Sequence, residues 1–139
     1  MSEKTHTWSS ISTRGAHRII ETTVAAARQR DFPVSIAVVD RGGWLVEFHR
    51  MDGAVAGGVN GAIEKAISAA KFEEPLTKFS RMAAKEQDYI GNMPGLIPLG
   101  GAEPLKVDGH SVGAVAVSGA YEALEQELAE VAVAAFEEF

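Results

Sequence analysis

The chain contains no cysteine, which excludes disulfide bonds, thiolate metal sites and cysteine nucleophiles. No apolar run approaches the roughly 20 residues of a membrane-spanning helix, and the polar start MSEKTHTWSS is unlike a secretory signal. Residues 107–139 hold no lysine or arginine but seven acidic residues, and the net charge is −6. Because such a chain is poorly suited to phosphate backbones, we expect no nucleic-acid partner. We also expect no membrane association and a cytoplasmic location.

The 139 residues, 46% of them hydrophobic, are enough for one domain with a substantial core. Residues 1–11 are predicted to form a flexible N-terminal lead-in, and residues 12–139 a single domain. Helical spacing of apolar residues predicts a first helix from Ser12 to Arg30, capped by Ser12 or Thr13.

Two β-hairpins are predicted. Val34–Val39 and Ser111–Val117 are apolar on both faces, which is typical of central strands covered on both sides. Their turns are Asp40–Gly43 and Asp108-Gly109, where glycine supplies positive φ. The strand Trp44–His49 alternates and is predicted to be half-covered. Its first face would carry Trp44, Val46 and Phe48, and its second face Leu45, Glu47 and His49.

Helices fill the rest of the chain. One is predicted from an Asp52 N-cap to about Phe72, with glycines at 53, 57 and 61 on a face that something must approach closely. A shorter helix starts at Pro75, and the last opens at Ser118-Gly119. A further strand is possible near Leu96–Leu99. This order indicates an α+β fold with helices packed on an antiparallel sheet. Because the helices would cover two fully apolar strands only in part, we expect self-association to cover the remainder.

Four motifs, in this order, resemble the GlcG/HbpS-like family. They are Ala37-Val38-Val39-Asp40-x-Gly42-Gly43, Arg50-Met51-Asp52-Gly53-Ala54, Ala62-x-x-Lys65-Ala66 and Asp108-Gly109-x-x-Val112-Gly113-Ala114-x-x-Val117-Ser118-Gly119. The family includes haem-binding or haem-degrading domain proteins and the C-terminal domain of PduO-type cobalamin adenosyltransferases. The resemblance implies a profilin-like α+β fold with a five-stranded antiparallel sheet, assembly into dimers or larger oligomers, and haem as a ligand.

A ligand pocket is predicted where the first hairpin meets the following helix. The Arg50 guanidinium suits a carboxylate or phosphate, with Asp52 beside it and a helix N-terminus nearby. The alternative for Arg50 is a structural ion pair with Asp52. Lys65 would present an ammonium to an anionic ligand, or else be a solvated helix lysine. Gly95, in the Pro94–Gly101 loop, would complete the pocket together with Ser118 and Gly119.

Ser118 and Gly119 lie at a strand-to-helix turn without the Gly-x-Ser-x-Gly pattern of a nucleophile elbow. Ser118 is therefore expected to cap the last helix, whose N–H groups would still suit an anion. The glutamates at 122, 125, 127 and 130 are interpreted as a solvated acidic face, and no metal site is expected.

Two histidines are candidates for a haem axial ligand, which must face an apolar slot. His17 lies on the apolar stripe of the first helix and is expected to be partly buried, and His49 lies on the polar face of its strand. The alternatives are a satisfied buried or interface histidine for His17 and an exposed surface residue for His49.

Three functions remain open from the residues. The leading hypothesis is a small oligomeric protein that binds an anionic small molecule or carboxylate-bearing cofactor, with haem suggested by the resemblance. The second is an enzyme acting on a small hydroxy or aromatic acid, with His49, Lys65 or Glu103 as proton-transfer groups. The third is a structural or assembly domain without a ligand.

Overall fold

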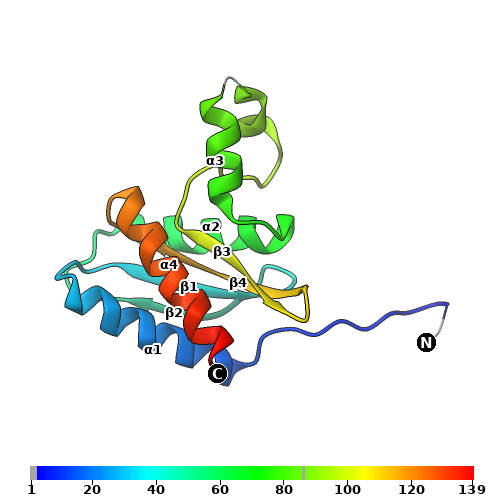
Figure 1. Cartoon of the computed structure of the whole chain (residues 1–139), viewed down its shortest axis with the longest axis horizontal. Coiled ribbons are helices and arrows are strands. Elements are labelled where there is room, and N and C mark those ends of the chain that lie inside the picture. The colour runs from blue at the N-terminus through cyan, green and yellow to red at the C-terminus, as the bar shows by residue number, and fades with distance from the viewer. Residues whose placement is uncertain (1–2, 86) are drawn as a thin grey trace.

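The computed structural model describes residues 3–85 and 87–139, so residues 1 and 2 of the predicted lead-in lie outside the described residues. Figure 1 shows a sheet with helices packed on both of its faces. The elements are α1 (Thr13–Gln29), β1 (Ser35–Asp40), β2 (Leu45–Arg50), α2 (Gly57–Phe72), α3 (Leu76–Ala84), the 3-10 helix η1 (Asp88–Asn92), β3 (Ala102–Val107), β4 (His110–Ser118) and α4 (Glu122–Glu137).

The sheet is antiparallel and has four strands among the described residues, in the order β2-β1-β4-β3. The α+β class is therefore confirmed, and the prediction of five strands is wrong. The segment 96–99 forms no strand because its N–H groups bond elsewhere. Ile97 N donates to the Ser68 hydroxyl of α2, and Leu99 N donates to Ile97 O.

One chain covers both faces of its own sheet. Helices α1 and α4 pack on one face around Ile36 and Val38, and α2 packs on the other around Ala37 and Val39 (Figure 1). All four of these β1 side chains are fully buried, as predicted for a central strand. The premise that the helices cover these strands only in part is therefore wrong, since the helices cover them alone, and self-association stays a prediction.

Helix α2 starts later than predicted. Its N-cap is Ala56, so Asp52 is not a cap; Asp52 and Gly53 instead form a turn before the helix. The Arg50 side chain stabilises this turn, because Nε and Nη2 both donate to Ala54 O at 3.2 and 2.8 Å. By contrast, Ser12 caps α1 as predicted, accepting a hydrogen bond from Gly15 N at 3.0 Å.

Close approach of α2 to the sheet explains two helical glycines. A β-carbon at Gly58 would lie 3.1 Å from Gly119 Cα, and one at Gly61 would collide with the Ser118 hydroxyl. Gly53 lies in the turn before α2 and Gly57 faces open space, so of the three glycines predicted to share a closely approached face only Gly61 does so. The contact fixes the end of β4 against α2.

A β-bulge interrupts the pairing of β1 with β2. Val38 pairs with Glu47, but the next residue, Val39, pairs with Leu45, which leaves Val46 as an extra residue. The bulge breaks the predicted alternation: Val46 packs on the α1 face, whereas Phe48 packs on the α2 face. Bulges re-aim side chains in this way.

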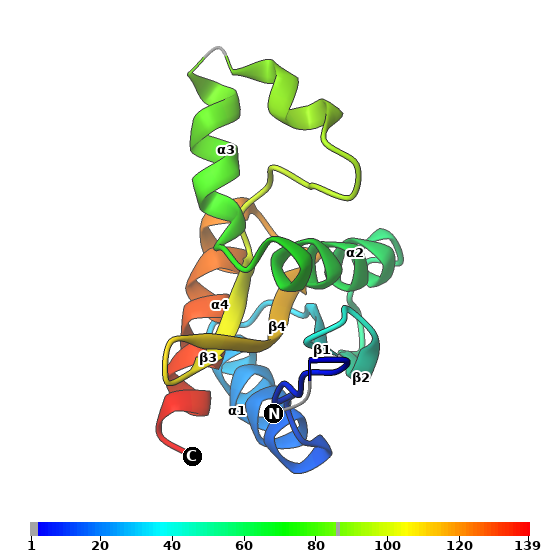
Figure 2. The same ribbon diagram turned by 90° about the vertical axis from the view of Figure 1, so that its right-hand side faces the viewer.

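Helix α3 and η1 form an arm that projects away from the sheet (Figure 2). Leu76 at the base of α3 is buried, while Phe79 and Met82 pack against the α2 core only in part. Over the described residues, no helix is both long and apolar enough to cross a membrane.

Candidate functional site

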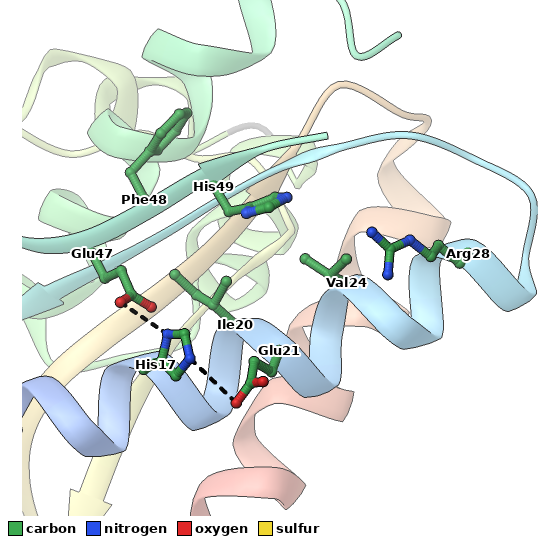
Figure 3. Close-up of a pocket in the computed structure, with 8 residues that line it drawn as sticks. All are labelled: His17, Ile20, Glu21, Val24, Arg28, Glu47, Phe48 and His49. Carbon is green, nitrogen blue, oxygen red and sulfur yellow. Dashed lines mark hydrogen bonds and ion pairs between the residues drawn. The ribbon is translucent and has the colours of Figure 1, made fainter. Parts of the chain in front are cut away.

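A groove runs between helix α1 and the edge strand β2, with a volume of about 400 Å³. Figure 3 shows side chains from both elements pointing into it. We call it the α1–β2 groove. Its lining residues are His17, Ile20, Glu21, Val24, Arg28, Glu47, Phe48 and His49.

Helix α1 supplies one wall of the groove. Ile20 and Val24 are buried and form its apolar part, with His17 one turn before Ile20 and Arg28 one turn after Val24. Contrary to expectation, the His17 side chain is 60% exposed, so it is neither a core histidine nor partly buried. The helix thus presents an imidazole and a guanidinium at opposite ends of an apolar patch (Figure 3).

His17 lies between two carboxylates. Its Nδ1 is 3.2 Å from Glu47 Oε1 on β2, and its Nε2 is 3.4 Å from Glu21 Oε1 on its own helix. The ring is therefore held by groups on both sides of the groove. Both ring nitrogens therefore lie beside a carboxylate oxygen, and a ligand that bound Nε2 would have to displace Glu21.

Strand β2 supplies the opposite wall. Glu47 and His49 point toward α1, and Phe48 points away, as the period of two requires (Figure 3). His49 is exposed, on the face predicted for it. The sequence did not single out Glu47 or Arg28. Only their spacing could have indicated them: Glu47 lies two residues before His49, and Arg28 lies one helical turn after Val24.

A second hollow, the corner cavity, adjoins the groove and shares Arg28 and His49 with it. Its volume is about 470 Å³. It is lined by Arg28, Asp31, Phe32, Pro33, His49, Arg50, Met51 and Asp52. Arg50 uses two of its five N–H donors on Ala54 O, and no carboxylate among the described residues forms an ion pair with it. The structure therefore brings His17, His49, Arg50 and Asp52 to one connected surface.

Lys65 is not on that surface. Only 3% of its side chain is exposed, and Nζ donates to Gly100 O, Val117 O and Glu125 Oε1 at 3.0, 2.7 and 3.1 Å. All three ammonium donors are thus used inside the protein. Burial lowers the pKa of Lys65, although the Glu125 carboxylate acts in the opposite direction. Lys65 is neither the solvated lysine nor the pocket cation that the sequence suggested.

The N–H groups of the turn after β4 are also bonded to a side chain of the protein itself. Glu125 Oε2 accepts hydrogen bonds from Gly119 N and Ala120 N at 2.9 and 3.1 Å. Because α4 begins at Glu122 with Tyr121 as N-cap, Ser118 does not cap it. In this structure the anion expected at the Ser118-Gly119 turn is therefore the chain's own Glu125.

The remaining predicted residues lie elsewhere. Gly95, with φ of +81°, borders a separate hollow of about 550 Å³ between α2 and residues 91–97. Glu103 lies on β3, where its Oε2 accepts a hydrogen bond from Gln126 Nε2 at 2.9 Å. His49, Lys65 and Glu103, the proton-transfer candidates of the enzyme hypothesis, thus occupy three different places and form no acid–base pair.

The partly buried Glu103 should make the free energy of unfolding depend on pH. Partial burial raises the pKa of its carboxyl, and Glu130 adds to the increase while the Gln126 hydrogen bond opposes it. Because the pKa of this carboxyl is raised, the folded state binds the proton more tightly than the unfolded state does, and protonation of Glu103 stabilises the fold. This stabilisation is complete below about pH 4.3, the ordinary pKa of a glutamate, and disappears as pH rises through the pKa of the folded state. Glu103→Gln should remove that dependence. Urea unfolding of both proteins from about pH 4 to about pH 8 measures it, and a difference that stays constant with pH would contradict it.

Comparison with known proteins places the chain in a family. The family described as "Haem degrading protein HbpS-like" matches residues 11–134. Protein GlcG of Escherichia coli K12 is 33% identical over 108 residues, which are 78% of this chain and 81% of GlcG.

Solved structures agree with these matches. A double mutant of HbpS from Streptomyces reticuli superposes with a TM-score of 0.87 at 26% identity, covering 96% of this chain and 92% of that one. A structure described as a PduOC:Heme complex has a TM-score of 0.82 at 23% identity, covering 91% and 94% of the two chains.

Proposed function

We propose that this chain, which belongs to the haem-degrading HbpS-like family, binds haem in the α1–β2 groove and the corner cavity. One observation carries the proposal. His17 and His49, from elements distant in the sequence, face one groove whose wall is the apolar pair Ile20 and Val24 (Figure 3). A haem site needs an axial ligand beside an apolar surface.

The residues present fit the chemical groups of haem. His17 is exposed and supplies an imidazole for iron, with His49 as the second candidate. Ile20 and Val24, each no more than 5% exposed, would meet the macrocycle only through the small apolar surface that they present at the floor of the groove. Haem also carries two propionates, which the guanidinium forks of Arg28 and Arg50 suit, at the end of the groove where the two hollows join. Bound haem would supply a redox-active iron whose potential depends on these neighbours.

The comparisons support this ligand. The family is described as haem-degrading, and PduOC, which shares the fold, was solved as a haem complex. Lys65, Ser118 and Gly119 take no part in the site proposed here, because Lys65 and the turn N–H groups are bonded to Glu125. Arg50 keeps the role of anion-binding residue that its sequence motif suggested.

Self-association belongs to the same proposal. The arm of α3 and η1 stands away from the sheet, and the apolar side chains of Tyr89, Met93 and Leu99 on and after it are more than half exposed. A second copy of the chain would bury them. Charge favours such pairing, because α3 carries Lys78 and Arg81 while the chain after residue 106 carries only acidic residues among its Asp, Glu, Lys and Arg.

Haemin titration of the purified protein tests this function. The wild type should develop a Soret band at one haem per chain, and native mass spectrometry of the same sample should give multiples of 14.8 kDa plus haem. His17→Ala should weaken binding by more than the roughly 10–100-fold that loss of an outer-shell partner costs, because the ligand itself is lost. His49→Ala should have a smaller effect.

The matched control is His110→Ala, since His110 is exposed at the start of β4 and lies in neither hollow of the site. It should bind haemin like the wild type. A wild-type protein that leaves the Soret region of free haemin unchanged would refute the function. Unchanged affinity in His17→Ala would refute the ligand.

A further inference from the structure

We infer that Glu47 is the positioning residue of the site: its carboxylate fixes the orientation and tautomer of His17, so that Nε2 is the nitrogen presented to iron. The iron part of this inference rests on the proposed function; the tautomer part does not. The contact that carries it joins Glu47 Oε1 to His17 Nδ1 at 3.2 Å, across thirty residues of sequence (Figure 3).

The two carboxylates beside His17 are not equivalent. Glu47 is closer, and only 27% of its side chain is exposed, whereas 67% of the Glu21 side chain is exposed and its contact with Nε2 is 3.4 Å. A less hydrated carboxylate makes the stronger hydrogen bond, because water competes for it less. A neutral His17 ring therefore places its proton on Nδ1, facing Glu47.

Glu47 also has an oxygen whose burial nothing in the fold explains. Its Oε2 is inaccessible to solvent and has no hydrogen-bond partner among the described residues. Burying a carboxylate oxygen without a partner costs stability, so its position calls for an explanation, and a functional role supplies one. A glutamate that served only as a solvated strand residue would turn both oxygens to water.

The bulge in β2 explains how the carboxylate reaches this position. Because Val46 is the extra residue, Val46 and Glu47 lie together toward α1 instead of on opposite faces. Val46 packs against the core there, beside the strand position from which Glu47 meets His17. Since β2 is bonded to β1 along its length, the carboxylate comes from a backbone that is fixed relative to α1.

The chemical consequence follows from the tautomer. A ring that donates Nδ1–H to a carboxylate leaves the lone pair of Nε2 for a metal, and the carboxylate makes that nitrogen a stronger donor. Glu21, now near Nε2, must yield that position when iron takes it. Glu47 therefore assists the iron site, and Glu21 competes with it.

The haem-loaded protein gives the first test. Glu47→Gln keeps the shape and removes the charge, so we expect haemin affinity to fall about 10–100-fold. The midpoint potential of the bound haem should rise, because a weaker donor stabilises ferric iron less. Glu21→Gln, a matched change on the other side of the ring, should raise affinity, because it weakens the group that competes with iron for Nε2. Equal losses in both variants, or wild-type affinity and potential in Glu47→Gln, would overturn the inference.

A second test needs no haem. ¹⁵N NMR of the His17 ring, at a pH above about 8 where imidazole is neutral, reports which nitrogen is protonated. Wild type should show Nδ1–H, and Glu47→Ala should shift the ring toward Nε2–H, while Glu21→Gln should retain Nδ1–H. If wild type shows Nε2–H, the positioning role is wrong even when haem binds. If it shows Nδ1–H but the protein fails to bind haemin, only the proposed function is wrong.

Discussion

Replacing Lys65 with methionine is expected to lower the free energy of unfolding by about 3–5 kcal/mol, which is the usual cost of removing one partner of a buried ion pair. Methionine fills the space of the lysine stem but leaves Glu125 without its cation and leaves Gly100 O and Val117 O without a donor. Because small domains are stable by only about 5–15 kcal/mol, a large share of the total is lost. Urea unfolding, monitored by circular dichroism, measures this loss of stability.

Two variants make this result specific. Lys78→Met breaks an exposed pair with Glu74 and should cost no more than about 1 kcal/mol. The double variant Lys65→Met with Glu125→Gln should be more stable than Lys65→Met alone, because it no longer buries an unpaired carboxylate. A loss for Lys65→Met no larger than that for Lys78→Met would show that the cluster contributes little to stability.

The interior role of Lys65 shows what the sequence cannot reveal. Its motif is readable, but its partner Glu125 lies sixty positions away on another helix, and no local pattern joins them. Arg50 is a similar case. It was expected to pair with Asp52 or a ligand, yet it donates to the carbonyl of Ala54 in the following turn, and α2 starts only at Gly57.

Local signals, by contrast, predicted the fold well. The Ser12 cap and the Asp108-Gly109 turn follow from interactions within a few residues, and the unbroken apolar run of β1 marks it as a buried strand. The groove was only half predictable. His17 and His49 were named as separate candidates, but their meeting depends on the packing of α1 against β2, and Glu47 depends on a bulge that the alternating pattern does not show.

Gly113 is a second position at which a small change should have a large effect. Its φ is +155°, and a β-carbon there would collide with the carbonyl oxygen of Val39 on the neighbouring strand. Neither group can move aside easily, because β4 lies between β1 and β3 and its backbone is bonded on both sides. Gly113→Ala therefore combines backbone strain of about 1–3 kcal/mol with overpacking of a similar size.

We expect Gly113→Ala to lower the free energy of unfolding by about 2–6 kcal/mol, the sum of those two costs. The control is Gly57→Ala, at a helical glycine with open space around it, which should be neutral or slightly stabilising. Thermal unfolding of both variants compares a glycine required by sheet contact with one that is not. If Gly113→Ala unfolds at the wild-type temperature, β4 can shift away from β1 at little cost. The sheet that holds β2, and with it Glu47 and His49, would then be less rigid than the haem site proposed here requires.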